Sequence, residues 1–219
     1  MICPNCGAII EEPDHLIMGK DVITFGSYRQ DTKTREKTPV RWRVLEKSDG
    51  KLKVISSEVL DCGMFDEGGH TREWEWCSLR KWLNEEFLNE AFSPEERERI
   101  LENRVKNPGN ERYGTPGGRD TLDKIFLLSI EEVNRYFYLN GYYRDSCCRA
   151  SGYAVSRGAS RTGSGNCKWW LRTPGSDGNE MINAAIVLED GRISYYGANS
   201  QFGFVGIRPV LVLSDLQDT

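Results

Sequence analysis

The chain lacks the features that would place it directly in several common classes. The 219 residues include 29 basic and 33 acidic ones, so the formal net charge of the chain is −4. The basic surplus typical of nucleic-acid-binding proteins is therefore missing. No run of about 18 apolar residues is present, so no membrane-spanning helix is expected. The first residues, MICPNCGAIIEEPDH, do not resemble a secretory signal peptide. We therefore expect neither a nucleic-acid partner nor a membrane partner.

The cysteine pattern is a poor disulfide framework. The seven cysteines are odd in number, and Cys147 and Cys148 are adjacent, which favours a reducing compartment and a cytoplasmic location. The sequence also has no P-loop, no dinucleotide-binding glycine turn, no HExxH motif and no GxSxG motif. Cys62, His70 and Cys77 share one region without a third group to orient them, so core packing is the simpler interpretation than nucleophilic chemistry.

What is present predicts an α+β fold. Hydrophobic residues make up 38% of the chain, an ordinary share for a globular protein. Alternation and turn residues predict strands at 22–28, 39–47 and 51–57, with a hairpin turn at Ser48-Asp49-Gly50. Helical spacing predicts a helix capped by Ser78, and capping boxes begin at Ser93 and Ser129. Further strands are expected at 124–129, 169–172, 182–188, 192–196 and 206–214, separated after residue 140 by long glycine-rich loops.

A short N-terminal piece, residues 1–19, is predicted to be separate from a main domain at 20–219. Its Cys3-Pro4-Asn5-Cys6-Gly7 turn offers two thiolates in the spacing of a zinc ribbon. It is only half of such a site, because a zinc ribbon needs four ligands and no second CxxC follows. His15 is a candidate third ligand, and a second chain is another way to complete the site. The alternative is a degenerate ribbon that binds no metal.

Two further clusters are weaker candidates for binding sites. Asp120, Asp123 and Glu131 offer oxygen ligands of the kind that calcium prefers, but they do not match an EF-hand loop and more often cap turns and helices. The stretch RDSCCRASGYAVSRGASR (144–161) carries four arginines and is the only basic cluster. It suits an anionic ligand, although a solvated surface loop is the ordinary interpretation.

Several segments together resemble one bacterial and phage domain of unknown function. They are ITFGSY, PVRWRVLE, CSLRKWLNEEFLNEAFSPEE, GGRDTLDKIFLLSIEEV, WWLRTPG and VGIRPVLVLS, and they span residues 22–214 in the order of that family. The family is similar to the C-type-lectin-like fold, in the branch of formylglycine-generating enzymes. The resemblance implies mostly antiparallel strands, two or three helices and long C-terminal loops, with strand 22–28 paired to strand 206–214.

The resemblance implies binding more than catalysis. Formylglycine-generating enzymes use a cysteine pair near the C-terminal core, and no cysteine follows Trp170 here, so that pattern does not carry over. The same fold is the scaffold of variable proteins made by diversity-generating retroelements, which bind ligands through C-terminal loops. We therefore expect a non-catalytic protein that binds a protein or small-molecule ligand. The alternatives are an oxidase-like enzyme and a structural phage or cell-surface module.

The expected ligand-binding residues combine rigid aromatic rings with short polar groups, the composition of adaptable recognition surfaces. In the pairs Trp169-Trp170 and Tyr195-Tyr196, strand alternation predicts that one ring points inward and one outward. Trp170, Arg172 and Arg208 are expected to belong to the scaffold. The predicted ligand-binding set is Ser176, Asp177, Asn179, Glu180, Tyr195, Tyr196, Asn199, Ser200, Gln201 and Phe202.

Overall fold

A computed structural model describes residues 21–32, 36–138, 144–178 and 181–214. Cys3, Cys6 and His15 lie outside the described residues, and so does the whole predicted piece at 1–19. Asn179 and Glu180, two of the predicted ligand-binding residues, lie outside them as well. Within the described part, no helix is long and apolar enough to cross a membrane.

The first sheet has five strands and is built around a tight hairpin. Along β2, Val40, Trp42 and Val44 are buried while Arg41 is exposed, as the alternation predicts. Asp49 and Gly50 both have positive φ (49° and 66°), which matches the type I′ turn favoured between twisted strands. The spatial order is β1 (Val22–Arg29), β2 (Lys37–Ser48), β3 (Lys51–Ser56), β12 (Val210–Ser214) and β7 (Ile125–Phe126).

The predicted pairing of the first strand with the last is wrong. β12 pairs antiparallel with β3, with Val210 opposite Ile55, and on its other side with β7. β1 pairs only with β2 at the edge of the sheet. The two strands share one sheet but are separated by the β2–β3 hairpin, because β12 packs beside the buried end of β3, where Val54 and Ile55 lie opposite Leu211 and Val210.

The second sheet also has five strands and splits a segment that the sequence predicted as one strand. Residues 206–214 form β11 and β12, which belong to different sheets and are separated by Arg208 and Pro209. All pairings in this sheet are antiparallel except β11 with β8. The order is β10 (Ile193–Asn199), β9 (Asn183–Val187), β8 (Trp169–Pro174), β11 (Gly206–Ile207) and β4 (Asp61–Cys62).

Strand β8 is buried along its whole length, which corrects the expectation of one outward ring at Trp169-Trp170. Both indoles are fully buried. Trp169 donates to the carbonyl of Ser146, and Trp170 donates to the carbonyl of Gly63 at 2.8 Å. The alternation holds, but both faces of this central strand are covered, so both side chains belong to the core.

The helices are short, and three of the described ones follow the predicted positions. Both capping boxes form, with the Ser93 and Ser129 hydroxyls accepting from the N–H groups of Glu96 and Glu132. Cys77, not Ser78, is the N-cap of the first helix. The helical segments are α1 (Ser78–Trp82), the π-helical η1 (Leu83–Phe87), α2 (Leu88–Ala91), α3 (Pro94–Arg99), α4 (Ile130–Phe137), the 3₁₀-helical η2 (Arg144–Ser146) and α5 (Gly152–Ser156).

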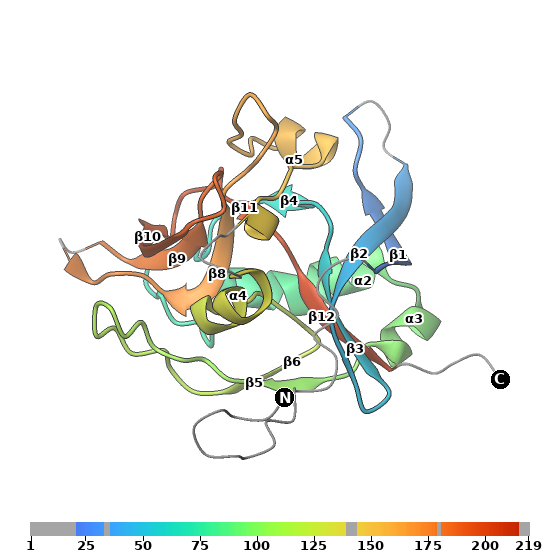
Figure 1. Cartoon of the computed structure of the whole chain (residues 1–219), viewed down its shortest axis with the longest axis horizontal. Coiled ribbons are helices and arrows are strands. Elements are labelled where there is room, and N and C mark those ends of the chain that lie inside the picture. The colour runs from blue at the N-terminus through green and yellow to red at the C-terminus, as the bar shows by residue number, and fades with distance from the viewer. Residues whose placement is uncertain (1–20, 33–35, 139–143, 179–180, 215–219) are drawn as a thin grey trace, which may run out of the picture.

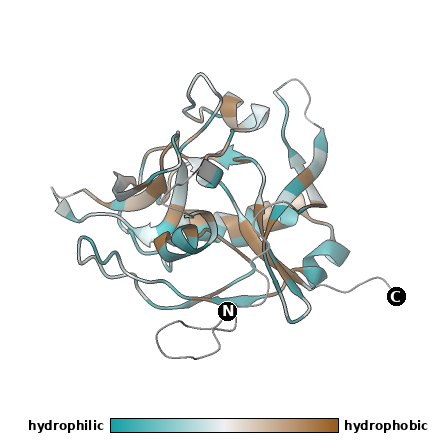
Figure 2. Ribbon diagram, viewed as in Figure 1, coloured by the Kyte–Doolittle hydropathy of each residue, from teal (hydrophilic) through white to brown (hydrophobic). Residues whose placement is uncertain are grey.

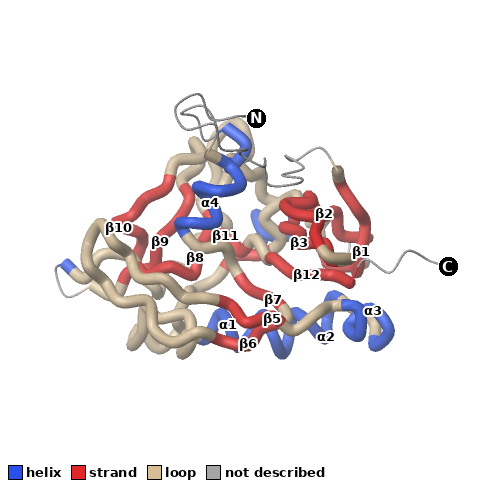
Figure 3. Tube along the Cα trace, turned by 60° about the horizontal axis from the view of Figure 1, so that its bottom comes forward, coloured by secondary structure: helices blue, strands red, loops and turns tan. Residues whose placement is uncertain are grey.

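The elements form an α+β arrangement in which helices flank two sheets. Figure 3 shows the two sheets side by side, with α1, α2 and α3 along one side and α4 on the other. A small ribbon of β5 (Asn103–Val105) and β6 (Thr121–Asp123) lies near α1. Apolar residues concentrate on the strands at the centre, whereas α3 and the loop before β6 are mostly polar (Figure 2).

Arg208 joins the two sheets at the break between β11 and β12. Its side chain is buried, its Nε donates to the carbonyl of Ser56 at 3.0 Å, and its guanidinium lies 5.1 Å from the ring centroid of Trp169. Arg172 on β8 is likewise buried and donates to the carbonyls of Lys106 and Leu127. The predicted scaffold role of Trp170, Arg172 and Arg208 is therefore confirmed.

Candidate functional site

Two loops and a strand from distant parts of the chain meet at one end of the molecule. The 107–119 and 174–178 segments and strand β10 lie at the left in Figure 1, opposite β1 and α3. The N–H of Ser176 donates to the carbonyl of Tyr196 at 2.9 Å. The buried Asn110 amide donates to the carbonyls of Pro174 and Tyr195 at 2.9 and 2.8 Å. These bonds tie the two predicted ligand-binding loops to a third loop, 107–119.

A glycine lets β10 approach β9 closely beneath these loops. Gly197 has a φ of 84°, and a Cβ added there would lie 2.1 Å from the carbonyl oxygen of Ala184. The register of β10 against β9 shifts between Ser194 and Ala198, so the strand bulges at this point. A bulge of this kind redirects the neighbouring side chains, here those of Tyr195 and Tyr196.

Exposed apolar side chains concentrate on these loops. Ten large hydrophobic side chains are exposed among the described residues, and all but Val22, Leu122 and Tyr138 belong to these segments or to the 63–76, 181–182 and 200–205 segments, which hydrogen bonds and an ion pair join to them. Single exposed apolar residues need no explanation, but a concentration of them marks a binding surface. We call this group the loop surface; its members are Met64, Trp76, Tyr113, Met181, Tyr196, Phe202 and Phe204.

The aromatic rings of the loop surface are arranged in pairs. Tyr113 and Tyr196 meet edge to face with ring centroids 6.1 Å apart, although they are far apart in sequence. Phe202 and Phe204 stack at 4.9 Å, and the ammonium of Lys168 lies 4.7 Å from the Phe204 ring centroid. Because paired rings restrict each other, they present apolar area at a low cost in conformational entropy.

Charged groups connect the loops around these rings. Arg72 and Asp177 form an ion pair at 3.1 Å between the 63–76 and 174–178 segments. Arg119 pairs with Glu75 and lies 5.4 Å from the ring centroid of Trp76. The amide of Gln201 donates to the carbonyl of Glu67 at 3.3 Å. Arginines and aromatic rings together are typical of the energetically dominant parts of protein interfaces.

The structure divides the predicted ligand-binding residues into three groups. Asp177, Tyr196, Gln201 and Phe202 are exposed, and Tyr195 and Asn199 are half-buried. Ser176 and Ser200 are buried, so their side chains are not part of the loop surface. Asn179 and Glu180 lie outside the described residues.

Sequence reasoning missed members of the loop surface that come from earlier in the chain. Trp76 is one example: Trp74, two residues before it, is fully buried and donates to Asp123 at 2.9 Å, whereas Trp76 is 62% exposed. Side chains two residues apart point to the same face of an extended segment, so the pattern WEWC gave no sign that one ring is buried and the other exposed. Tyr113 and Phe204 carried no signal, because only the fold brings their loops to the others.

Two of the three acidic residues considered as calcium ligands make structural contacts instead. Asp123 is buried and bonded to Trp74, Arg80 and Thr121, whereas Asp120 pairs with Arg104. In the described ranges, no group of three or more His, Cys, Asp or Glu side chains is placed to hold a metal ion.

The cysteines weighed for nucleophilic chemistry are core residues. Cys62 and Cys77 are both buried. Burial raises the pKa of the Cys62 thiol to about 11 and that of Cys77 to about 12. A reactive cysteine needs a thiolate, which low-pKa environments provide. These two side chains are therefore protonated thiols at neutral pH.

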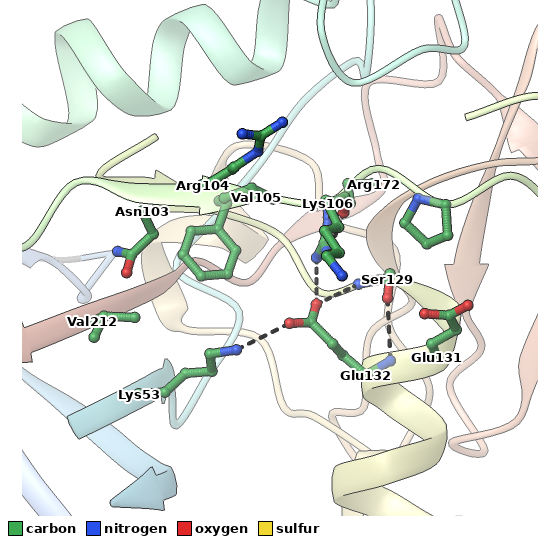
Figure 4. Close-up of a pocket in the computed structure, with 12 residues that line it drawn as sticks. Lys53, Asn103, Arg104, Val105, Lys106, Ser129, Glu131, Glu132, Arg172 and Val212 are labelled. Carbon is green, nitrogen blue, oxygen red and sulfur yellow. Dashed lines mark hydrogen bonds and ion pairs between the residues drawn. The ribbon is translucent and has the colours of Figure 1, made fainter. Parts of the chain in front are cut away.

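A separate cavity of about 300 Å³ lies between the sheets, lined by β3, β5, β7, α4, β8 and β12. Figure 4 shows Glu132 at its centre, with Lys53 on one side and Arg172 on the other. Lys53 Nζ lies 3.2 Å from Glu132, Arg172 pairs with the same carboxylate, and the N–H of Ser129 donates to it at 3.0 Å. Burial alone would raise the pKa of Glu132, but Arg172 and Lys53 lower it to about 2.

Comparison with known proteins identifies the family and nothing more specific. The model of a family described as a domain of unknown function (DUF6273) matches residues 49–215. This is more than half of the chain, so the chain belongs to that family. No curated protein and no solved structure matches it.

Proposed function

We propose that this member of the family is a non-catalytic binding protein that recognises a protein ligand through its loop surface. The observation that carries the proposal is the concentration of exposed aromatic side chains on loops that are held together by buried hydrogen bonds. Rigid scaffolds that display such loops are a common basis of recognition. Burying Tyr196, Phe202 and their neighbours against a partner would remove apolar area from water, which favours association.

A protein ligand fits this surface better than a small molecule. Small ligands prefer concave sites that enclose most of their surface. Neither the cavity around Glu132, nor the one beside Glu46, nor a small one beside Asp61 is lined by Trp76, Tyr113, Tyr196, Phe202 or Phe204. The surface also includes Arg72, Arg119 and Arg112, whose guanidinium lies 5.2 Å from the ring centroid of Tyr195. An open surface that combines aromatic rings with arginines resembles the interacting patches of protein complexes.

We further propose that the scaffold is C-type-lectin-like and that its loops tolerate variation, as in the variable proteins of diversity-generating retroelements. Support comes from the α+β architecture and from the placement of the C-terminal loops at one end of the second sheet. The edge position of β1 departs from the strand pairing that this resemblance implied. A near-copy of codons 165–210 beside a reverse-transcriptase gene, differing only at adenines, is the expected sign of diversification. A genomic neighbourhood without it would reject that part of the proposal.

The binding proposal is tested with a purified partner and matched variants. Candidate partners are captured from a lysate of the producing cell, and each is then purified and titrated against the wild type. Phe202→Ser and Tyr196→Ser should each weaken binding at least about tenfold, as substitutions at dominant interface residues do. Val22→Ser, at another exposed apolar residue on the edge strand β1, should leave it unchanged. If no purified candidate binds, or if all three variants bind alike, the proposal is wrong.

A further inference from the structure

The cavity between the sheets contains a basic surplus that the chain as a whole does not have. Lys53 and Arg172 share a single carboxylate, Glu132. Glu131, exposed at the start of α4, is the other acidic residue that lines this cavity. Lys106 also lines it and is exposed. Because the formal net charge of the protein is −4, a cavity in which cations outnumber carboxylates calls for an explanation.

Unused hydrogen-bond donors remain around Glu132. An ammonium has three donors and a guanidinium has five. Lys53 makes one bond, to Glu132, and its other contacts are with the rings of Phe126 and Tyr136. Arg172 uses Nε, Nη1 and Nη2 for the carbonyls of Lys106 and Leu127 and for Glu132. Its contacts account for four N–H groups, so one donor of Arg172 and two of Lys53 are left for another acceptor.

Two further cations line the cavity, Arg104 and Lys106, and they differ in whether a carboxylate already neutralises them. Arg104 points away from the cavity in Figure 4 and pairs with Asp120 at 3.0 Å. The ammonium of Lys106 has no bonding partner among the described residues, although its backbone carbonyl accepts from Arg172. The free cation at the cavity is therefore Lys106, beside the partly used donors of Lys53.

A second cavity of about 240 Å³ extends the first. The two share Lys53, Asn103 and Val212, and the second is also lined by Lys51 and Arg135. Its one acidic residue, Glu46, accepts from Tyr136 at 2.6 Å and pairs with Arg135 at 3.4 Å. Along the joined groove, five cations face three carboxylates: Lys51, Lys53, Lys106, Arg135 and Arg172 against Glu46, Glu131 and Glu132.

We propose that this groove binds a small organic phosphate, with its phosphoryl group near Lys53 and Lys106 and its organic part against Val105, Pro108 and Val212. The choice of phosphate over carboxylate follows from the donors. A carboxylate is best recognised by a free guanidinium fork, and the fork of Arg172 is already occupied. The remaining donors are mostly ammonium groups, which bind phosphate as point charges.

The proposal is tested by calorimetric titration at constant ionic strength with three probes: inorganic phosphate, ribose 5-phosphate and phosphoserine. Constant ionic strength is needed because salt screens such contacts. We expect saturable binding of ribose 5-phosphate or phosphoserine, tighter than that of inorganic phosphate. Lys106→Gln should weaken it at least about tenfold, because a charge-assisted hydrogen bond is lost. Lys81→Gln, at an exposed lysine on α1, should leave it within about twofold.

Three results would overturn the proposal. The first is no saturable binding of any probe up to about 10 mM, a range that covers weak affinities. The second is equal binding of the organic phosphate by Lys106→Gln and the wild type. The third is that acetate displaces the organic phosphate as effectively as inorganic phosphate does. Circular dichroism of Lys106→Gln checks that the fold is retained; the side chain is exposed, so the variant should fold. The site is independent of the proposed protein recognition, and Tyr196→Ser should therefore bind the organic phosphate as the wild type does.

Discussion

The indole N–H of Trp170 donates to the carbonyl of Gly63 at 2.8 Å, which joins the central strand β8 to the first residue of a loop that contributes to the loop surface. The Trp170 ring also packs 5.7 Å from that of Phe65. Trp170→Ala should lower the free energy of unfolding by about 3–5 kcal/mol, as large truncations in a core do. Urea denaturation provides the measurement.

Trp76→Ala is the matched control, because it removes the same side chain from a site that is 62% exposed. Its effect should stay near 0.5 kcal/mol, as is usual for surface changes. Equal losses for the two tryptophans would mean that β8 is not a central strand of the core.

Changes on the loop surface should affect recognition and leave the fold intact. Tyr196 and Gln201 are exposed, and the hydrogen bond that the Gln201 side chain donates to the Glu67 carbonyl is exposed as well. Tyr196→Ser and Gln201→Ala should each change the free energy of unfolding by no more than about 0.5 kcal/mol. Thermal melts check this. Unfolding as severe as that of Trp170→Ala would show that these loops are part of the core.

Gly197 should tolerate no side chain, because β10 passes so close to β9 there. A Cβ would lie 2.1 Å from the Ala184 carbonyl oxygen, in a backbone conformation that favours glycine. Gly197→Ala should therefore cost more than about 1 kcal/mol. Gly163, around which no heavy atom lies within 4 Å of an added Cβ, is the control, and Gly163→Ala should be neutral or slightly stabilising. Denaturation of both variants decides whether the close approach is real.

Local sequence signals predicted most of the elements but not how they assemble. The Ser93 and Ser129 capping boxes and the Asp49-Gly50 turn were predictable because each depends on residues within a few positions. The place of β1 was not, since the partner of β12 is chosen by packing between distant strands. The prediction that one of the Trp169 and Trp170 rings would be exposed was wrong for a similar reason. Alternation places the two rings on opposite faces of β8, but only the fold shows that both faces are covered.

The candidate sites show the same limit. The exposure of Tyr196 and Phe202 agrees with the predicted binding loops, which are continuous in sequence. The groove around Glu132 combines Lys53, Lys106 and Arg172 from three distant segments, and the sequence offers no spacing that connects them. Glu132 was recognised as a capping residue, and its second role as the shared partner of two cations depends on tertiary structure.

The zinc prediction for Cys3, Cys6 and His15 concerns residues outside the described part of the chain, and it remains a prediction. Protein purified without chelator should contain at least about half a zinc ion per chain, the stoichiometry of one tetrahedral site shared by two chains. Metal analysis of the Cys3→Ser, Cys6→Ser double variant should show its loss. Cys147→Ser, at a half-buried free cysteine, should retain the metal. A lower content in the wild type would reject the site.

The Glu132 carboxylate should make its full contribution to the free energy of unfolding near neutral pH. Its carboxylate lies between Arg172, whose side chain is 4% exposed, and Lys53. Glu132→Gln leaves these cations without their counter-ion, so we expect a loss of about 3 kcal/mol at pH 7, the cost of breaking a buried ion pair. Glu85→Gln is the control, because Glu85 pairs with Lys81 at 4.0 Å on an exposed helix surface and should contribute less than about 0.5 kcal/mol.

The pH dependence separates this charge effect from a loss of packing. The pKa of Glu132 is lowered to about 2 in the folded protein, against about 4.3 in an unfolded chain. The stabilisation is therefore complete above about pH 4.3 and is lost as the pH falls through about 2. The difference in unfolding free energy between the wild type and Glu132→Gln should be constant from pH 7 to about 5 and should shrink toward pH 2. A difference that persists unchanged in acid would assign the effect to packing, not to the carboxylate.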